Sequence, residues 1–289
     1  MSFHKYQALL QTLELGSISK AAEKMGYTQS AVSRMIMDLE SEWNVELLHR
    51  GHGGISMTSA CQQLLPLLRS IVTDKNELDY AVRELHGLHS GLIRLGTFTT
   101  VSDMWIPDLL SSFHKKYPGI TFKLFNGESY TEIEGWIAEG KVDCGFVSIP
   151  AANDLDAHFL RRDMLSVVLP PCHPLANAPY ILPSQLENEP FILLNNDIEI
   201  MQFVSHLPAP PSINYEVSTD HTILSMVERG LGISVMHSLI ADSDRYNVVW
   251  KPFEQAQYRD IGIASLKNAR VSSIARLFIE HVCGYIANL

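Results

Sequence analysis

The first 57 residues alternate short amphipathic segments with glycine-containing turns. Apolar side chains recur every three or four positions over residues 3–15, which predicts a helix that ends at Gly16. A second short helix is predicted over residues 17–25, and Thr28 is the expected N-cap of a third helix that continues through Glu42. Two short helices joined by a tight turn that contains glycine predict a helix-turn-helix.

A glycine-rich segment follows the third predicted helix. Three glycines fall within four positions of the stretch RGHGGISMT, between two short apolar segments. We interpret this pattern as a β-hairpin, which adds a wing to the helix-turn-helix.

The segment from Thr58 to about His89 has no glycine before Gly87 and shows a seven-residue apolar repeat. A repeat of this length predicts a coiled-coil seam that pairs two chains, and the alternative is a long helix packed within its own chain. Pro66 is expected to bend or restart the helix. The two interleaved apolar rows give the candidate dimerisation residues Leu64, Leu68, Ile71, Leu78, Val82 and Leu85.

After Gly91 the chain alternates predicted strands and helices. Residues 92–149 read as three strands separated by helices at 102–116 and 131–139, a βαβαβ pattern that predicts a parallel sheet with right-handed crossovers. A second strand–helix series follows to about residue 265, and a final helix is predicted over 271–286. Two α/β lobes with a cleft between them account for this part of the chain.

Composition and charge narrow the classes of protein that fit. Of 289 residues, 46% are hydrophobic and 19% charged, as in a globular protein, and no apolar run approaches the roughly 18 residues that span a bilayer. The first residues do not resemble a secretory signal, so a cytoplasmic location and no membrane partner are expected. The net charge of −10 implies that any DNA contact depends on a few placed cations and helix N-termini.

Motifs of catalysis and of metal binding are absent from the sequence. The four cysteines are scattered without a CxxC pair, so they are expected to be free thiols, with a redox-sensing Cys144 or Cys172 as the alternative. The sequence also lacks GxSxG, HExxH, a P-loop and GxGxxG after a strand. We therefore expect no catalytic residues, no metal site and no cofactor; the alternative is a small-molecule-binding protein or enzyme with an accessory helix-turn-helix.

The N-terminal stretch contains a dense set of motifs: Phe3, GSISKAAE at 16–23, TQSAVSRMIMDLE at 28–40, and Leu47, Leu48 and Arg50. With these residues it resembles the DNA-binding domain of the LysR family of bacterial transcriptional regulators. Matching segments continue along nearly the whole chain, in IRLGTFTT, FHKKYPGI, EGKVDCGF, HPLA at 173–176 and VERGLGISVM at 227–236.

The patterns and the resemblance together predict an α+β multidomain protein. Its expected parts are a winged helix-turn-helix at 1–58, a long linker and dimerisation helix at 59–89, and a two-lobed α/β effector domain at 90–289. Lobe I is expected over about 91–161 and 266–289, and lobe II over about 162–265. Such effector domains resemble type 2 periplasmic binding proteins.

The first turns of the third helix carry the predicted DNA contacts, because the start of a recognition helix lies deepest in the major groove. For Arg34 the alternative is an ion pair with Asp38. The resemblance adds backbone or minor-groove contacts from Arg50 and the wing, where His52 replaces the cation that the family often has. The candidate DNA-binding residues are Ser19, Thr28, Gln29, Ser30, Ser33, Arg34, Arg50 and His52.

Three hydroxyl-rich turns that precede predicted helices carry the candidate effector site, since free N–H groups at helix N-termini favour polar ligands. The resemblance places contacts at Thr99, Thr100, Ser129 and near Thr222; the alternative is ordinary helix capping. No Arg or Lys lies in these turns, which favours a less acidic or aromatic ligand. The candidate effector-binding residues are Thr97, Phe98, Thr99, Thr100, Ser102, Ser129, Phe146, His221 and Thr222.

The resemblance also implies partners and a mechanism. Two chains are expected to pair through the long helix and present two recognition helices to double-stranded DNA, and two such homodimers are expected to form a homotetramer that bends the DNA. A small-molecule effector of unknown identity is expected to move the lobes, and RNA polymerase is the expected partner of an activator.

Overall fold

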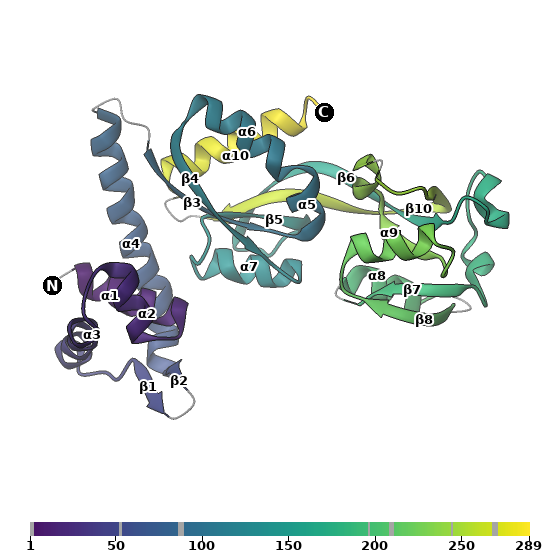
Figure 1. The fold of residues 1–289 in the computed structure, drawn as a ribbon. Coiled ribbons are helices and arrows are strands. Elements are labelled where there is room, and N and C mark those ends of the chain that lie inside the picture. Colours follow the sequence, from purple (N-terminus) through teal and green to yellow (C-terminus); the bar gives the residue numbers. More distant parts are fainter. Residues whose placement is uncertain are drawn as a thin grey trace. The chain divides into compact units, whose positions relative to one another are not determined.

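A computed structural model describes residues 3–51, 54–85, 90–195, 197–207, 211–243, 245–267 and 271–289 (Figure 1). The chain divides into two compact units. One unit comprises Met1–Leu88 with Ala138–Lys141, and the other comprises His89–Ile137 with Val142–Leu289. The predicted class of an N-terminal helix-turn-helix followed by a two-lobed α/β domain is confirmed.

Three helices form the head of the N-terminal unit, and their bounds are α1 (Phe3–Leu15), α2 (Ile18–Met25) and α3 (Gln29–Trp43). Each helix buries one side against the other two in a shared apolar cluster that includes Leu9, Ala21 and Ile36. Gly26 ends α2 with φ of +71°, in the left-handed region that favours glycine, and this sharp turn redirects the chain into α3.

A hairpin and a long helix complete this unit. Strands β1 (Leu48–Gly51) and β2 (Gly54–Met57) pair in antiparallel register, as the wing prediction expects. Helix α4 runs from Ser59 to Leu85 and contains Pro66 within its first turns, so the chain continues through the proline without a new helix start.

A six-stranded sheet with strand order β4-β3-β5-β10-β6-β9 organises the second unit. Strand β3 pairs in parallel with β4 and β5, as predicted from the βαβαβ pattern, while β10 runs antiparallel to both β5 and β6. The strands are β3 (Ser90–Thr97), β4 (Gly119–Asn126), β5 (Cys144–Ile149), β6 (Leu155–Leu169), β9 (Ser234–His237) and β10 (Val249–Leu266).

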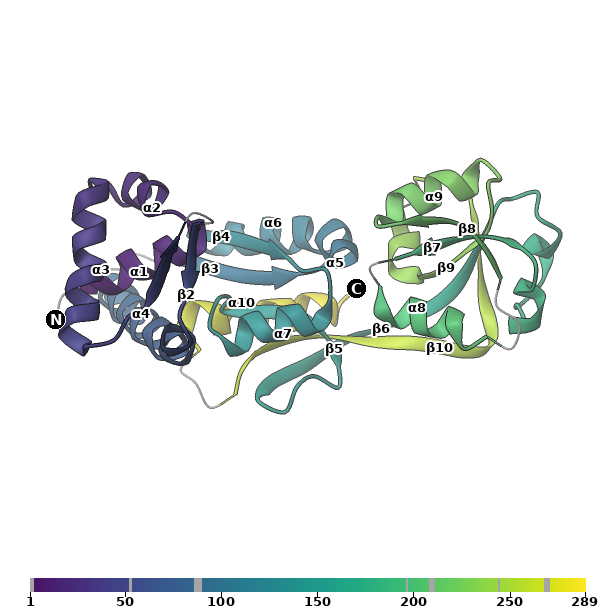
Figure 2. The ribbon, with the colours of Figure 1, turned by 90° about the horizontal axis from the view of Figure 1, so that it is seen from below.

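Strands β6 and β10 are longer than the short strands that the sequence pattern predicts near LSVVLP and RDIGIAS. At about 3.3 Å per residue each spans roughly 50 Å or more, enough to run from one lobe into the other, as Figure 2 shows. The two lobes of this unit are therefore joined by a continuous antiparallel pair.

Helices cover the sheet of the first lobe, and one predicted helix is in fact two. The predicted helix at 102–116 is replaced by α5 (Thr99–Met104) and α6 (Ile106–Lys116), which meet at Trp105, so the first helix begins three residues earlier than expected. The other helices of this lobe are α7 (Tyr130–Ala138) and α10 (Ser273–Ile286).

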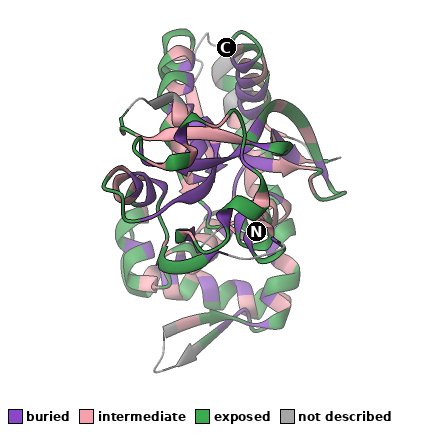
Figure 3. Ribbon diagram, turned by 90° about the vertical axis from the view of Figure 1, so that its right-hand side faces the viewer, coloured by how far each residue is buried: buried purple, intermediate pink, exposed green. Residues whose placement is uncertain are grey.

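The second lobe has its own apolar core around Phe191, Ile223 and Val235. A two-stranded parallel sheet lies beside β9, and helices pack on it (Figure 2). Figure 3 shows buried residues along the strands and exposed residues on the outer turns of the helices. The elements of this lobe are β7 (Pro190–Leu194), β8 (Ser212–Val217), α8 (Ile198–Ser205), α9 (Asp220–Glu228) and the 3₁₀ turns η1 (Pro174–Asn177), η2 (Pro183–Leu186) and η3 (Ser238–Ser243).

Candidate DNA-binding surface and effector cleft

Helix α3 presents a polar edge opposite its buried edge. Thr28 caps the helix, because its hydroxyl accepts a hydrogen bond from the Ala31 backbone N–H at 3.2 Å. Val32, Ile36 and Leu39 are fully buried, whereas Gln29, Ser30 and Arg34 are exposed and Ser33 is half-buried. The predicted reading residues therefore share one accessible edge of the N-terminal unit.

The surroundings of this edge leave Arg34 available. Within the described residues, Arg34 forms no ion pair with Asp38, the alternative that the sequence left open.

Ser17 caps α2 by accepting a hydrogen bond from the Lys20 N–H at 3.3 Å, and the predicted contact Ser19 is exposed in the first turn of that helix.

The wing is tied to α3 by one carboxylate. Oε1 of Glu40 accepts hydrogen bonds from the backbone N–H groups of Leu47 at 2.8 Å and Leu48 at 3.1 Å, which fixes the start of β1. Arg50 pairs with Ile55 in the hairpin backbone, and the predicted contact His52 lies outside the described residues.

The exposed apolar residues of α4 coincide with the predicted seam only in part. Leu68 is 2% exposed and, with the partly buried Leu64, packs into the core of the N-terminal unit. The burial of Leu68 in its own chain contradicts its prediction as a dimerisation residue, whereas the prediction for the partly buried Leu64 stays a prediction. The exposed large apolar residues are Leu67, Ile71, Leu78 and Val82, and the side chain of Leu85 lies outside those described.

A cavity of about 240 Å³ lies between the two lobes of the second unit. Lobe I contributes the start of α5 and the turn that leads into α7, and lobe II contributes the starts of α8 and α9 and the end of β9. The lining residues are Phe98, Thr99, Thr100, Gly127, Glu128, Ser129, Tyr130, Thr131, Leu194, Asp197, Glu199, Ile200, Ser218, Asp220, His237 and Arg259.

Close packing of α7 positions the turn at residues 127–130 beside this cavity. Ile133 of α7 sits over Gly96 and Gly145, which lie opposite each other on β3 and β5. A Cβ atom at Gly96 or Gly145 would meet Cγ2 of Ile133 at 2.8 or 2.7 Å, closer than side chains approach. The two glycines therefore let the helix lie against the sheet, with Tyr130 at its N-terminal end.

Arg259 is the buried basic group of the cavity. Its Nε and Nη2 donate to Oδ2 of Asp163 at 3.0 and 2.8 Å, and its Nη1 donates to the hydroxyl of Tyr130. The guanidinium carbon also lies 5.1 Å from the centre of the Phe98 ring. The side chain of Arg259 is 3% exposed. Through Asp163 it connects β10 to β6, and through Tyr130 it connects β10 to the turn of lobe I that leads into α7.

Carboxylates outnumber this cation. Burial raises the pKa of Asp220 to about 6, although the nearby charge of Arg259 opposes the shift. Burial and the neighbouring charge of Asp197 likewise raise the pKa of Glu199. Negative charge is therefore crowded at this end of the cavity.

Three polar contacts connect the lobes around the cavity. The Thr100 hydroxyl donates to Oδ2 of Asp220 at 3.4 Å, and the Ser148 hydroxyl donates to Oε1 of Glu199 at 3.2 Å. Nε2 of His221 lies 3.0 Å from Oδ2 of Asp103. Because each pair joins one lobe to the other, a ligand that disturbs them acts on the separation of the lobes.

Four of the predicted effector residues line the cavity, namely Phe98, Thr99, Thr100 and Ser129. Thr97 and Ser102 instead bond to each other behind it at 3.1 Å, His221 joins the lobes, and Thr222 is exposed in the cap of α9. The prediction of Phe146 as a stacking residue is wrong: its ring is fully buried in lobe I against Trp105.

The sequence prediction missed the charged residues of the cavity. It expected no basic group there, yet Arg259 is supplied by β10, which no turn motif marks. Asp197 and His237 were also missed as lining residues; Asp197 does show the signal of an N-cap before α8. Among the described helices, none is both long enough and apolar enough to cross a bilayer.

Two family models match this chain. Residues 3–62 match the bacterial regulatory helix-turn-helix protein of the lysR family, and residues 86–284 match the LysR substrate binding domain. Together the two models cover both units.

Curated relatives match along most of the chain. The HTH-type transcriptional regulator YvbU of Bacillus subtilis is 29% identical, over 97% of this chain and 97% of its own length. A probable HTH-type transcriptional regulator, LrrA of Synechococcus elongatus, is 31% identical over 83% of this chain and 82% of its own length.

Solved structures share the fold. A cysteine variant of full-length OxyR from Pseudomonas aeruginosa superposes with a TM-score of 0.78 at 19% identity, covering 98% of each chain. Full-length CbnR in complex with its target DNA gives a TM-score of 0.56 at 20% identity, covering 99% of this chain and 100% of that chain. The regulatory domain of Synechocystis CcmR in complex with 2-PG gives 0.63 at 24% identity, covering 69% of this chain and 99% of that chain.

Proposed function

Because this chain belongs to the LysR family of transcriptional regulators, we propose that the polar edge of α3 reads its operator and that the cavity between the lobes binds its effector. The chain is a DNA-binding regulator with an effector-binding domain. What we propose is the assignment of these two activities to particular residues.

Direct base reading is assigned to the start of α3. Gln29 and Arg34 carry the side chains that pair with adenine and guanine in the major groove, and both are exposed in the first two turns of α3. Ser30 and Ser33 are suited to phosphates or base edges, and Ser19 at the start of α2 to the backbone. Thr28 caps α3 and so orders the turn that precedes these residues. The wing residues Arg50 and His52 are proposed to contact the DNA backbone or the minor groove.

Pairing of two chains is assigned to α4. Leu67, Ile71, Leu78 and Val82 are exposed and follow spacings of four and seven residues, as a coiled-coil seam requires. Lys75 and Asp79, an ion pair along the helix, flank this row. A homodimer formed through the row presents two α3 helices to a dyad-symmetric operator, and two dimers form the proposed tetramer.

The cavity is proposed to bind without turnover, in keeping with a family of regulators. Ligand binding changes the contacts Thr100–Asp220 and Ser148–Glu199, which lie at its edge and join the lobes. A ligand that binds one lobe arrangement more tightly shifts the population toward it and alters the spacing of the DNA-binding heads. We also propose that the protein is cytoplasmic and that, if it is an activator, it contacts RNA polymerase.

The observation that carries the assignment is the division of α3 into a fully buried edge and an exposed edge of reading residues. The test is to sequence DNA fragments recovered with the purified full chain and to measure gel shifts with the enriched sequence. We expect a dyad-symmetric motif bound more tightly than scrambled DNA of the same length. Equal binding to both DNAs would contradict the proposal.

A further inference from the structure

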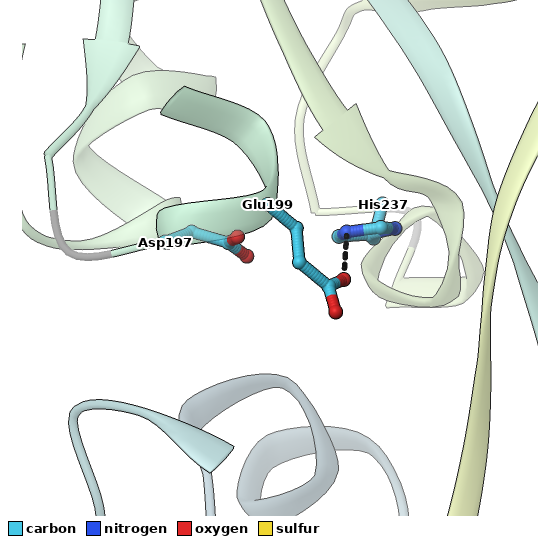
Figure 4. A group of neighbouring side chains, drawn as sticks. All are labelled: Asp197, Glu199 and His237. Carbon is cyan, nitrogen blue, oxygen red and sulfur yellow. Dashed lines mark ion pairs between the residues drawn. The ribbon is translucent and has the colours of Figure 1, made fainter. Parts of the chain in front are cut away.

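Three potential metal ligands meet at one end of the cavity. One oxygen of Asp197, one oxygen of Glu199 and one ring nitrogen of His237 all lie within 4.8 Å of one another. Asp197 and Glu199 flank the start of α8, and His237 ends β9, so two elements of lobe II supply the group. Figure 4 shows the three side chains converging, with Oε2 of Glu199 3.8 Å from Nε2 of His237.

Each carboxylate accepts a hydrogen bond through one oxygen, and the second oxygen of Asp197 lies 3.9 Å from Nη1 of Arg259. Oδ1 of Asp197 accepts the Ile200 N–H at 3.0 Å as the cap of α8. Oε1 of Glu199 accepts the Ser148 hydroxyl at 3.2 Å. Partners of this kind, outside the ligand set, orient the ligating atoms of metal sites.

His237 is a buried polar side chain without a partner. It is 7% exposed, and among the described residues neither Nδ1 nor Nε2 has a hydrogen-bond partner. Leaving such a group unsatisfied is costly, and a bound ion removes that cost.

The charges around the group favour a cation. The charge of Arg259 is compensated by Asp163, which accepts two of its hydrogen bonds, and by Asp197, whose Oδ2 lies 3.9 Å from Nη1 of Arg259. The acidic residues that line the cavity, Glu128, Asp197, Glu199 and Asp220, then face it with no further Arg or Lys among the described lining residues. A divalent cation offsets this repulsion, whereas an anionic ligand increases it.

We propose that Asp197, Glu199 and His237 bind a divalent first-row transition-metal ion, and that this ion is an effector of the regulator. One imidazole nitrogen and two carboxylate oxygens suit ions such as Zn²⁺, Co²⁺ and Mn²⁺ better than the all-oxygen preference of Mg²⁺. Ligands at about 2.1 Å from a tetrahedral ion lie about 3.4 Å apart, which small rotations of the two partly exposed carboxylate side chains achieve. This inference rests on the proposed role of the cavity as the effector site.

Three protein ligands leave a coordination position open to water or to an oxygen of a second ligand. Glu199 is one of the proposed ligands of the ion, and the same carboxylate accepts a hydrogen bond from the hydroxyl of Ser148 in lobe I. The ion therefore acts on a contact between the lobes, the step through which an effector is expected to alter DNA binding.

The test measures metal binding to the untagged full chain after dialysis against a chelator. Zn²⁺ and Co²⁺ are titrated in turn, bound metal per chain is measured by elemental mass spectrometry, and the visible absorption of bound Co²⁺ reports a nitrogen ligand. We expect one ion per chain. Glu199→Gln and His237→Asn are each expected to weaken Zn²⁺ binding at least about tenfold and to alter the Co²⁺ spectrum.

Two controls keep the result interpretable. His158→Asn, at the exposed pair His158–Asp156 on β6, is expected to leave Zn²⁺ binding unchanged. Glu199→Gln preserves the shape of a partly exposed side chain, so this variant alone tests the metal site if His237→Asn fails to fold. Failure of the wild type to bind any of Zn²⁺, Co²⁺ and Mn²⁺, or equal affinity in Glu199→Gln, overturns the proposal.

Gel shifts with operator DNA on the same samples separate this inference from the proposed function. A chain that binds operator but no metal remains a regulator with another effector, and the metal proposal fails. A chain that binds metal but no operator retains the metal site, and the DNA assignment fails. Support for both requires that Zn²⁺ change operator affinity in the wild type and not in Glu199→Gln.

Discussion

Arg259 and Asp163 lie directly opposite each other on β10 and β6, and their side chains form a buried ion pair with an N–O distance of 2.8 Å. Asp163 also accepts the Leu239 N–H at 2.8 Å through its other oxygen. The pair therefore ties together the two strands that join the lobes, the start of η3, and, through Tyr130, lobe I.

Asp163→Asn is expected to lower the free energy of unfolding by about 3 kcal/mol, because it leaves the buried guanidinium of Arg259 with only the more distant Asp197, at 3.9 Å, as a charge partner. Urea denaturation followed by circular dichroism measures the change. The next ion pair along the strands, Arg162–Asp260, is exposed, with an N–O distance of 2.8 Å. Asp260→Asn is the matched control and is expected to change stability little; equal losses in both variants would refute the argument from burial.

Arg34→Ala is expected to weaken specific operator binding by about 1–3 kcal/mol, or about 5- to 150-fold in Kd, because a paired contact to a base is lost. Fluorescence anisotropy with labelled operator measures the effect. Arg229→Ala removes an equally exposed arginine in the other unit, whose Nη1 bonds to Ser225. We expect this control to bind as the wild type does, and unaltered affinity in Arg34→Ala would exclude Arg34 as a base contact.

Leu78→Lys is expected to dissociate the proposed dimer, because it places a charge in the apolar row of α4. Light scattering coupled to size-exclusion chromatography gives the mass. Asn76→Lys places the same charge on the opposite side of the helix, where Asn76 is exposed, and is expected to leave the mass unchanged. A dimeric Leu78→Lys chain would show that the pairing surface lies elsewhere.

Glu40→Ala is expected to destabilise the N-terminal unit by about 1–2 kcal/mol and to weaken operator binding, because the N–H groups of Leu47 and Leu48 lose their acceptor. Thermal unfolding and anisotropy measure the two effects. Glu42→Ala, which removes only a surface pair with Lys5, is the control. Glu40→Gln retains an acceptor and should recover part of the loss; no difference between Glu40→Ala and Glu42→Ala would argue against the anchor.

The parts of the fold that depend on neighbouring residues were predictable from the sequence. The Thr28 cap, the glycine turn at Gly26 and the buried row Val32, Ile36 and Leu39 are all encoded within one or two helical turns. The hydroxyls Thr99, Thr100 and Ser129 reach the cavity because each precedes or begins a helix at the end of a strand.

What depends on distant packing was not predictable in the same way. The heptad pattern of α4 does not reveal that Leu68 is buried in the apolar cluster of its own N-terminal unit, since this role and a place in a seam both need an apolar side chain. Arg259 and Asp163 are separated by 96 positions and meet only because β6 and β10 pair in one register. Each looks like an ordinary surface charge on its own strand.

The position of β10 bears on how the protein is made. This strand lies between β5 and β6 in the sheet, yet it follows both of them in the chain, after the whole of lobe II. The chain between β6 and β10 holds the core of lobe II and can collapse during synthesis, whereas lobe I must wait with an open gap for its central strand and for α10. A nascent regulator therefore exposes that gap until β10 and α10 have been synthesised, and termination before β10 leaves lobe I unable to close.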